Sequence, residues 1–194
     1  MADQLATPQD LASLLQLNYA TLSGAQQATL AMLVELATAK VQRAAGGQRI
    51  VDITDTAVVD VRDIADYYLP LPQLPVRSVT TVKLDGLTIT DWVVRQQMLW
   101  RAGGWMVSFS PPSQAVVTYS HGYAAGSQWL QLARDMTLSL ARLGWGNPGG
   151  ATSEAIDDYR VTYGEADARM QMTDYMAASI ADAYGVSAYS TASR

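Results

Sequence analysis

The segment from Leu69 to Gly86 constrains the fold more than any other part of the chain. It reads LPLPQLPVRSVTTVKLDG and begins with three prolines within six residues, Pro70, Pro72 and Pro75. Because proline fixes φ at about −65° and has no amide donor, we expect a stiff, extended arm outside any central strand ladder. The residues that follow alternate as a strand does and end at Asp85-Gly86, a pair that predicts a tight hairpin. A stiff arm that leads into a hairpin suits a positioning role.

Residues 50–123 as a whole have the pattern of short strands separated by tight turns. The clearest hairpin pairs Val76–Leu84 with Leu87–Ile89. Consecutive short strands of this kind predict a small antiparallel meander. Further strands are expected at Val51–Ile53, Ala57–Val61, Tyr67–Leu69, Trp92–Val94, Met98–Trp100, Trp105–Phe109 and Ala115–Ser120.

Two helices are predicted ahead of the strands. Thr7 followed by Pro8 is typical of a helix start, with threonine as the N-cap and proline at the first helical position. Ser23 and Gln26 have the spacing of a capping box for a longer helix, which Gly46-Gly47 ends. Apolar residues at helical spacing are expected to face the core: Leu11, Leu14, Leu15, Leu30, Leu33, Val34, Ala37 and Val41.

Helical patterns return after the strands. A central helix is predicted over residues 127–145, with Trp129, Ala133 and Leu140 among the residues on its apolar face. The glycine-rich residues 146–164 predict a flexible loop followed by an extended segment at Tyr159–Tyr163. A last helix over residues 165–185 and a disordered tail over residues 186–194 complete the prediction.

Together these elements predict an α+β fold that is mainly a helical bundle. Two N-terminal helices within residues 1–47, the central helix and the C-terminal helix form the bundle, and the small antiparallel β meander over residues 50–123 is inserted in it. At 194 residues the chain is expected to form one domain over residues 1–185.

The composition excludes several classes of chemistry. The chain has no cysteine, so disulfides, thiolate catalysis and zinc–thiolate sites are ruled out. Its net charge is −5, and Lys40 and Lys83 are its only lysines, which disfavours tight binding to a phosphate backbone. No apolar run approaches the roughly 20 residues that span a bilayer, and the start MADQLATPQD predicts no secretory signal.

His121 is the only histidine and the first residue to consider as a catalyst. It could act as a general base between Tyr119 and Tyr123, but no nucleophile or carboxylate motif accompanies it. A lone histidine at a strand end is more often structural.

An acidic stretch is the second candidate, as a metal site. It consists of Asp52, Asp55, Asp60, Asp63 and Asp66. Because it lacks the spacing of a calcium-binding loop, we interpret these residues as solvated carboxylates. We therefore predict no catalytic residue, no metal and no cofactor.

The tryptophans and methionines are better explained by packing than by ligand binding. Base stacking normally accompanies a basic groove, which an acidic chain lacks, so core and interface packing is favoured for the tryptophans. Met170, Met172 and Met176 suit adaptable packing against a partner or a neighbouring subunit. The alternative function is a small carbohydrate- or substrate-binding or enzymatic domain, whose cleft would use Trp100, Trp105 and His121.

Three segments together resemble a known family. They are Leu71–Val79 (LPQLPVRSV) with Asp85-Gly86, Val117–Tyr123 (VTYSHGY), and Ser153-Glu154 through Asp158–Tyr163. This pattern, with the N-terminal helical pair, resembles the head-to-tail adaptor proteins (head-completion or connector proteins) of long-tailed bacteriophages. Arg160 departs from it, because a small polar residue is more usual there.

The resemblance implies a structural protein of the virion neck that is assembled in the host cytoplasm. Such proteins form a ring, dodecameric in the expected case, under the portal protein, extend the DNA channel and connect the capsid to the tail or a stopper protein. Double-stranded DNA would pass without specific binding, which suits an acidic chain. The chain could be monomeric before assembly. The predicted interface residues are Pro70, Pro72, Pro75, Arg77, Asp85, Tyr159, Arg160, Tyr163, Met172, Tyr175 and Met176.

Overall fold

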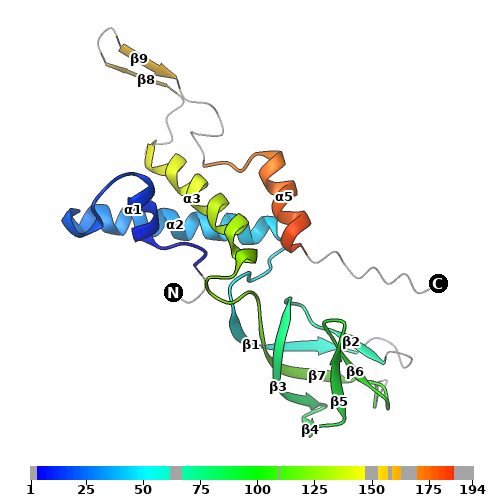
Figure 1. Ribbon diagram of the computed structural model, residues 1–194. Helices are drawn as coiled ribbons and strands as arrows, with labels where there is room; N and C mark the ends of the chain where they lie inside the picture. The colour runs from blue at the N-terminus through cyan, green and yellow to red at the C-terminus, as the bar shows by residue number, and fades with distance from the viewer. Residues whose placement is uncertain are drawn as a thin grey trace. The chain divides into compact units, whose positions relative to one another are not determined.

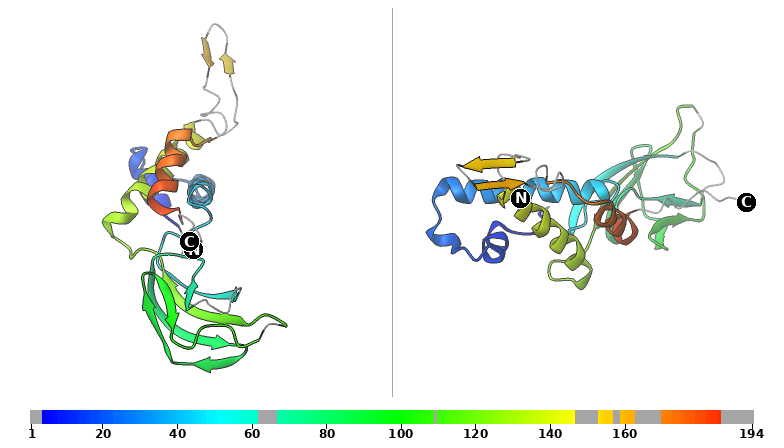
Figure 2. Two further views of the ribbon diagram at one scale, coloured as in Figure 1. Left: turned by 90° about the vertical axis from the view of Figure 1, so that its right-hand side faces the viewer. Right: turned by 90° about the horizontal axis from the view of Figure 1, so that it is seen from above.

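The protein divides into two compact units. A computed structural model describes residues 4–61, 67–108, 110–146, 153–156, 159–162 and 170–185. The β unit comprises residues 51–125, and the helical unit comprises residues 1–50 and 126–194 (Figure 1). Figure 2 shows the same elements from two further sides.

The helical unit is organised around its longest helix, α2, which contacts α1, α3 and α5. Leu30, Val34 and Val41 of α2 have no exposed surface. From α3 and α5, Leu140 and Ile180 are equally buried. The helices are α1 (Pro8–Leu14), η1 (Tyr19–Thr21), α2 (Gly24–Ala44), η2 (Gln128–Leu130), α3 (Gln131–Gly146) and α5 (Asp174–Tyr184).

Both predicted helix starts are confirmed. The Asp10 amide donates to the Thr7 hydroxyl over 3.1 Å, and the Asp10 carboxylate accepts from the Thr7 amide, which completes a capping box. The same reciprocal pair joins Ser23 and Gln26 at the start of α2. Each box satisfies amides that the first turn of a helix leaves without an intrahelical partner.

The predicted burial of apolar residues is confirmed for α2, but it is wrong for Leu14 of α1. All five of the predicted α2 residues are buried. In α1, Leu11 and Ala12 are buried, but the Leu14 side chain is 45% exposed. Leu14 lies about 200° around the helix from Ala12, so a helix of two turns cannot bury both.

The last helix begins later than the sequence predicted. Thr173 is the N-cap of α5, and its hydroxyl accepts from the Met176 amide over 3.3 Å. Residues 170–173 are not helical, and Met170 has φ of 49°, which a helix cannot accommodate. The Lys40 ammonium donates to the Met170 carbonyl over 2.6 Å and fixes this turn against α2. The predicted helical residues 165–169 and the predicted tail over 186–194 lie outside the described residues.

The helical unit also contains a two-stranded sheet. Its strands β8 (Ser153–Ile156) and β9 (Tyr159–Thr162) run antiparallel and pair with no other strand of the described residues. The predicted extended segment at 159–163 is therefore a strand as far as Thr162, and Tyr163 lies outside the described residues. The sequence did not predict β8, because the glycines and proline ahead of it indicated a loop.

The β unit contains two antiparallel sheets. The four-stranded sheet has the order β1-β7-β3-β4, and the three-stranded sheet has the order β2-β6-β5. The strands are β1 (Ile53–Asp60), β2 (Tyr68–Pro70), β3 (Val76–Leu84), β4 (Leu87–Ile89), β5 (Trp92–Arg95), β6 (Met98–Arg101) and β7 (Gln114–His121).

The predicted hairpin is confirmed, but the predicted meander is wrong. Asp85 and Gly86 have φ of 48° and 83° and join β3 to β4, as a type I′ turn requires. The last strand, β7, lies between β1 and β3, so two of the three neighbouring pairs in the four-stranded sheet are not consecutive in sequence. Residues 105–108 form no strand; Trp105 packs into the core instead, and Phe109 lies outside the described residues.

The two sheets of the β unit share one hydrophobic core. Leu69 and Leu99 enter it from the three-stranded sheet, and Val82, Val117 and Tyr119 enter it from the four-stranded sheet. The α+β class is as predicted, but the prediction of a mainly helical bundle with a small β meander inserted in it is wrong, because strands β1 to β7 form two sheets with a core of their own.

The β unit closes where its two ends meet. Val51 and Tyr123 form a β-bridge, and the Asp52 amide donates to the Tyr123 carbonyl over 2.9 Å. Gly122 has φ of 88°, and a Cβ atom there would come within 2.5 Å of the Val51 carbonyl oxygen. The glycine of the HGY sequence is thus required by both its backbone conformation and the close approach of the other end.

Replacing Gly122 by alanine should therefore destabilise the β unit. The positive φ alone costs about 1–2 kcal/mol for a residue with a Cβ atom, and the clash with backbone adds to it. Gly86→Ala is the matched control, since Gly86 has the same sign of φ with nothing within 4 Å of an added Cβ. Urea unfolding of both variants checks this; an equal loss in free energy of unfolding would contradict the close approach.

Candidate interaction surface

The three-stranded sheet has one buried face and one face turned to solvent. Leu69 of β2 and Leu99 of β6 are directly opposite each other and lie in the core. Their neighbours along the strands point to the other face, because successive side chains alternate across a strand. Tyr68 and Pro70 of β2 are exposed there.

The strand register groups six residues on this solvent face. Directly opposite residues place their side chains on the same side of a sheet, so the pairings define two rows across the three strands. We call this surface the outer face; its rows are Tyr68–Trp100–Val93 and Pro70–Met98–Arg95.

The outer face has the composition of a protein–protein interface. Tyrosine, tryptophan, methionine and arginine are the residue types enriched at such interfaces, and tyrosine, tryptophan and arginine dominate their energetic centres. The Arg95 guanidinium lies 4.7 Å from the centre of the Trp100 ring, a cation–π arrangement that orders both side chains. Tyr68 is 38% exposed and Val93 is 44% exposed, so a partner would still remove apolar surface from water.

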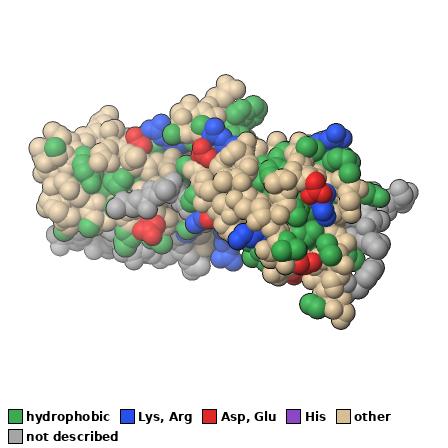
Figure 3. All heavy atoms as spheres, turned by 90° about the horizontal axis from the view of Figure 1, so that it is seen from below, with side chains coloured by type: hydrophobic (Ala, Val, Ile, Leu, Met, Phe, Trp, Pro, Cys, Tyr) green, Lys and Arg blue, Asp and Glu red, His purple; other side chains and the backbone are tan. Residues whose placement is uncertain are grey.

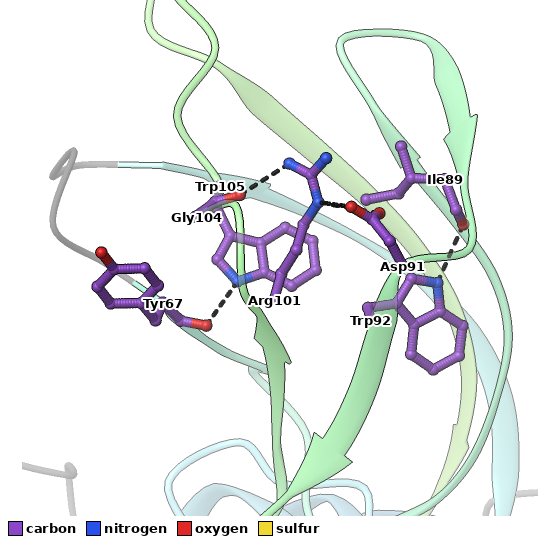
Figure 4. A network of polar contacts seen from close by, with 7 residues as sticks. All are labelled: Tyr67, Ile89, Asp91, Trp92, Arg101, Gly104 and Trp105. Carbon is purple, nitrogen blue, oxygen red and sulfur yellow. Dashed lines mark hydrogen bonds and ion pairs between the residues drawn. The ribbon is translucent and has the colours of Figure 1, made fainter.

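Polar contacts hold the strands that carry this face (Figure 4). The Arg101 guanidinium binds the Asp91 carboxylate at 2.9–3.0 Å and donates to the Gly104 carbonyl over 2.8 Å. Its hydrogen bond lowers the pKa of Asp91. The Trp105 indole donates to the Tyr67 carbonyl over 3.1 Å, which joins the segment after β6 to the start of β2. These contacts set a fixed geometry for the face before any partner binds.

The proline arm is not the straight brace that the sequence predicted. Residues 72–75 form bends that carry the chain from the three-stranded sheet to the four-stranded sheet. The Gln73 amide donates to the Tyr119 hydroxyl over 3.1 Å, and the Gly122 amide donates to the Pro75 carbonyl over 3.0 Å. Three prolines restrict their own positions and the residues just before them, which leaves Gln73 free to turn.

Among the predicted prolines, only Pro70 lies on the outer face. Pro72 is exposed in the bends and Pro75 is half-buried. The arm is thus a corner of the fold that is anchored to β7 and to the end of the unit. Burial raises the pKa of the Tyr119 phenol, which takes part in this anchoring.

Arg77 and Asp85 have contacts within the chain. The Arg77 guanidinium binds the Asp52 carboxylate at 2.8 Å, and both side chains are partly exposed. The Asp85 carboxylate accepts from the Gln114 amide over 2.7 Å and so joins the β3–β4 turn to β7. Both residues help to hold the four-stranded sheet together.

The other predicted interface residues belong to the helical unit. On α5 and just before it, Tyr175 is 78% exposed, while Met172 and Met176 are half-buried. Tyr159 and Arg160 lie in β9. Tyr163 lies outside the described residues.

The residues of the predicted ligand cleft do not face one common space. Trp105 and His121 have no exposed surface, so a substrate has no access to either ring. Trp100 is on the opposite side of the three-stranded sheet from the core that contains Trp105. His121 contacts the Tyr119 ring, with 5.2 Å between ring centres, and its Nε2 lies 3.7 Å from the Asp55 carboxylate.

The acidic stretch forms no metal cluster within the described part of the chain, where no three histidine or acidic side chains come together as ligands. Asp63 and Asp66 lie outside that part. Asp52 binds Arg77, and Asp60 accepts from the Gln114 side chain over 3.1 Å. Two of these carboxylates thus have ordinary surface partners.

Sequence reasoning missed most of the outer face. It named Pro70 as an interface residue but not Tyr68, Val93, Arg95 or Met98. A signal was present: in the strand MLWR the buried Leu99 stands between Met98 and Trp100, and alternation places those two on one face. What the sequence could not give was the pairing of β2 with β6, which brings Tyr68 beside Trp100.

Charges on the molecular surface are mixed in sign. On the face drawn in Figure 3, basic, acidic and hydrophobic side chains are interspersed, and its described residues form no extended basic area. Among the helices of the described residues, none combines the length and the apolar character that crossing a membrane requires.

Comparison of the sequence with protein-family models gave no match, and comparison with curated proteins gave none either.

Removing the Tyr119 hydroxyl tests the anchoring of the proline arm. Tyr119→Phe leaves the buried ring in place but takes away the acceptor for the Gln73 amide, so we expect a loss of about 1 kcal/mol in the free energy of unfolding. Tyr68→Phe is the control at an exposed position of the same unit and should change stability by less than about 0.5 kcal/mol. Chemical denaturation measures both; equal effects would mean that the arm is not anchored through this hydroxyl.

Proposed function

We propose that this protein is a structural subunit of the head–tail connector of a long-tailed bacteriophage, an adaptor that links the portal to the stopper or tail protein. The observation that carries the proposal is the outer face of the three-stranded sheet, an ordered, solvent-facing surface with the residue types of a binding interface. The sequence segments that resemble connector proteins supply the identity of the partners.

The structural roles of two of those segments support the proposal. Gly122 within VTYSHGY permits the two ends of the β unit to meet, and Asp85-Gly86 makes the β3–β4 turn. The resemblance therefore rests on residues that determine the fold of the β unit. A binding surface held on such a fixed scaffold suits a protein that joins other proteins.

The charge of the chain supports a position beside a DNA channel. With 13 basic and 18 acidic residues, the protein offers little that would hold phosphate. A ring subunit of this kind would let double-stranded DNA pass without gripping it. Burial of Trp105 and His121 speaks against the alternative of a ligand-binding or catalytic cleft built on them.

Binding to purified portal and stopper proteins tests this function. We expect one or both to bind the chain, and the double variant Tyr68→Ala/Trp100→Ala to weaken binding by about 30-fold or more, the effect of losing about 2 kcal/mol at an energetic centre. Leu87→Ala is the control, because Leu87 is 74% exposed on β4 of the other sheet. Sedimentation or surface plasmon resonance measures the affinities.

The possible results of this binding experiment distinguish a failure of the proposed connector function from a failure of the outer face as its binding site. No binding to either protein would overturn the proposed function. Binding that is unchanged in the double variant would keep the function but remove the outer face from it. Circular dichroism of each variant shows whether the β unit is still folded.

A further inference from the structure

The four-stranded sheet ends in a long edge strand. β1 is the terminal strand in the order β1-β7-β3-β4, and it pairs with β7 over all eight of its residues without a register shift. Within the described residues no strand pairs with its other edge. A strand edge of this kind is a template for adding a strand from another chain.

Of the usual devices that limit strand addition, this edge has only charged side chains, those of Asp55 and Asp60. Natural edge strands are commonly very short, bulged, interrupted by proline, or marked by charged side chains, lysine above all. The other edge strands of the β unit fit that description: β4 and β2 have three residues each, β2 ends in Pro70, and β5 has four. β1 contains neither proline nor lysine, and Val58 in its middle is 59% exposed.

A complementary element is present in the same chain. β8 and β9 form a two-stranded sheet that is separate from both sheets of the β unit. A two-stranded hairpin is marginally stable by itself and gains stability from a third strand. The charges indicate which strand fits: β1 carries the acidic residues Asp55 and Asp60, β9 carries the basic Arg160, and β8 carries the acidic Glu154.

We propose that β1 of one copy binds β9 of a second copy as an added strand. The contact joins two different surfaces, so each copy can give one strand and receive another, and repetition closes a ring or extends a filament. Backbone hydrogen bonds supply the attraction, and opposite charges favour β9 over β8. This inference does not depend on the portal or tail as partners, since it concerns contacts between copies of the chain.

Engineered disulfides test the contact directly, because the chain has no cysteine of its own. The full-length variants Val58→Cys and Arg160→Cys are purified, mixed in equal amounts and oxidised. We expect a cross-linked dimer in the mixture that is lost when either variant is oxidised alone. Leu87→Cys in place of Val58→Cys is the control, since it is more exposed and lies on the opposite edge of the same sheet.

Each other outcome contradicts the proposal. No dimer in the mixture shows that the two strands do not meet. A dimer of Val58→Cys with itself shows that two β1 edges pair with each other instead. A dimer of equal yield with Leu87→Cys shows that the cross-link reports random collision.

A second variant gives an independent measurement in solution. Val58→Lys places a charge on the exposed edge and should lower the average mass measured by light scattering toward that of one chain, while Leu87→Lys should leave it unchanged. An equal effect of both variants would overturn the proposal. Portal and stopper binding by Val58→Lys is measured alongside, so that failure of strand addition is not confused with failure of the connector function.

Discussion

The close approach of the two ends of the β unit is the constraint on which the rest of the structure depends. The backbone around Val51 packs against Gly122, and residues 51 and 123 form a bridge. Because the chain leaves and returns at one point, the residues between can build a closed unit with its own core. A unit of that kind interrupts the helical part of the sequence without needing its helices to complete the hydrophobic packing.

The shared core of this unit is what orders the outer face. Leu69 and Leu99 are buried against the four-stranded sheet, and strand alternation then fixes Tyr68 and Trp100 on the solvent side. The Arg101–Asp91 pair and the Trp105–Tyr67 hydrogen bond hold the adjoining turns. A partner would therefore meet a surface whose ordering cost is small, a condition that favours affinity.

Local features of the fold could be predicted from the sequence, and long-range ones could not. The capping boxes at Thr7 and Ser23 and the Asp85-Gly86 turn depend on neighbouring residues, and all three are confirmed. The position of β7 between β1 and β3 depends on contacts across some 60 residues, such as Thr56 with Thr118, which no local pattern specifies. The outer face was missed for the same reason, because it requires the register of β2 on β6.

Electron microscopy of the protein bound to portal-containing particles tests the central claim most directly, namely that the outer face is a contact surface in an assembled connector. The account predicts a ring of this protein below the portal, with density of a neighbouring protein over Tyr68, Trp100 and Arg95. A ring in which these side chains face solvent, or particles to which no ring is added, would contradict it.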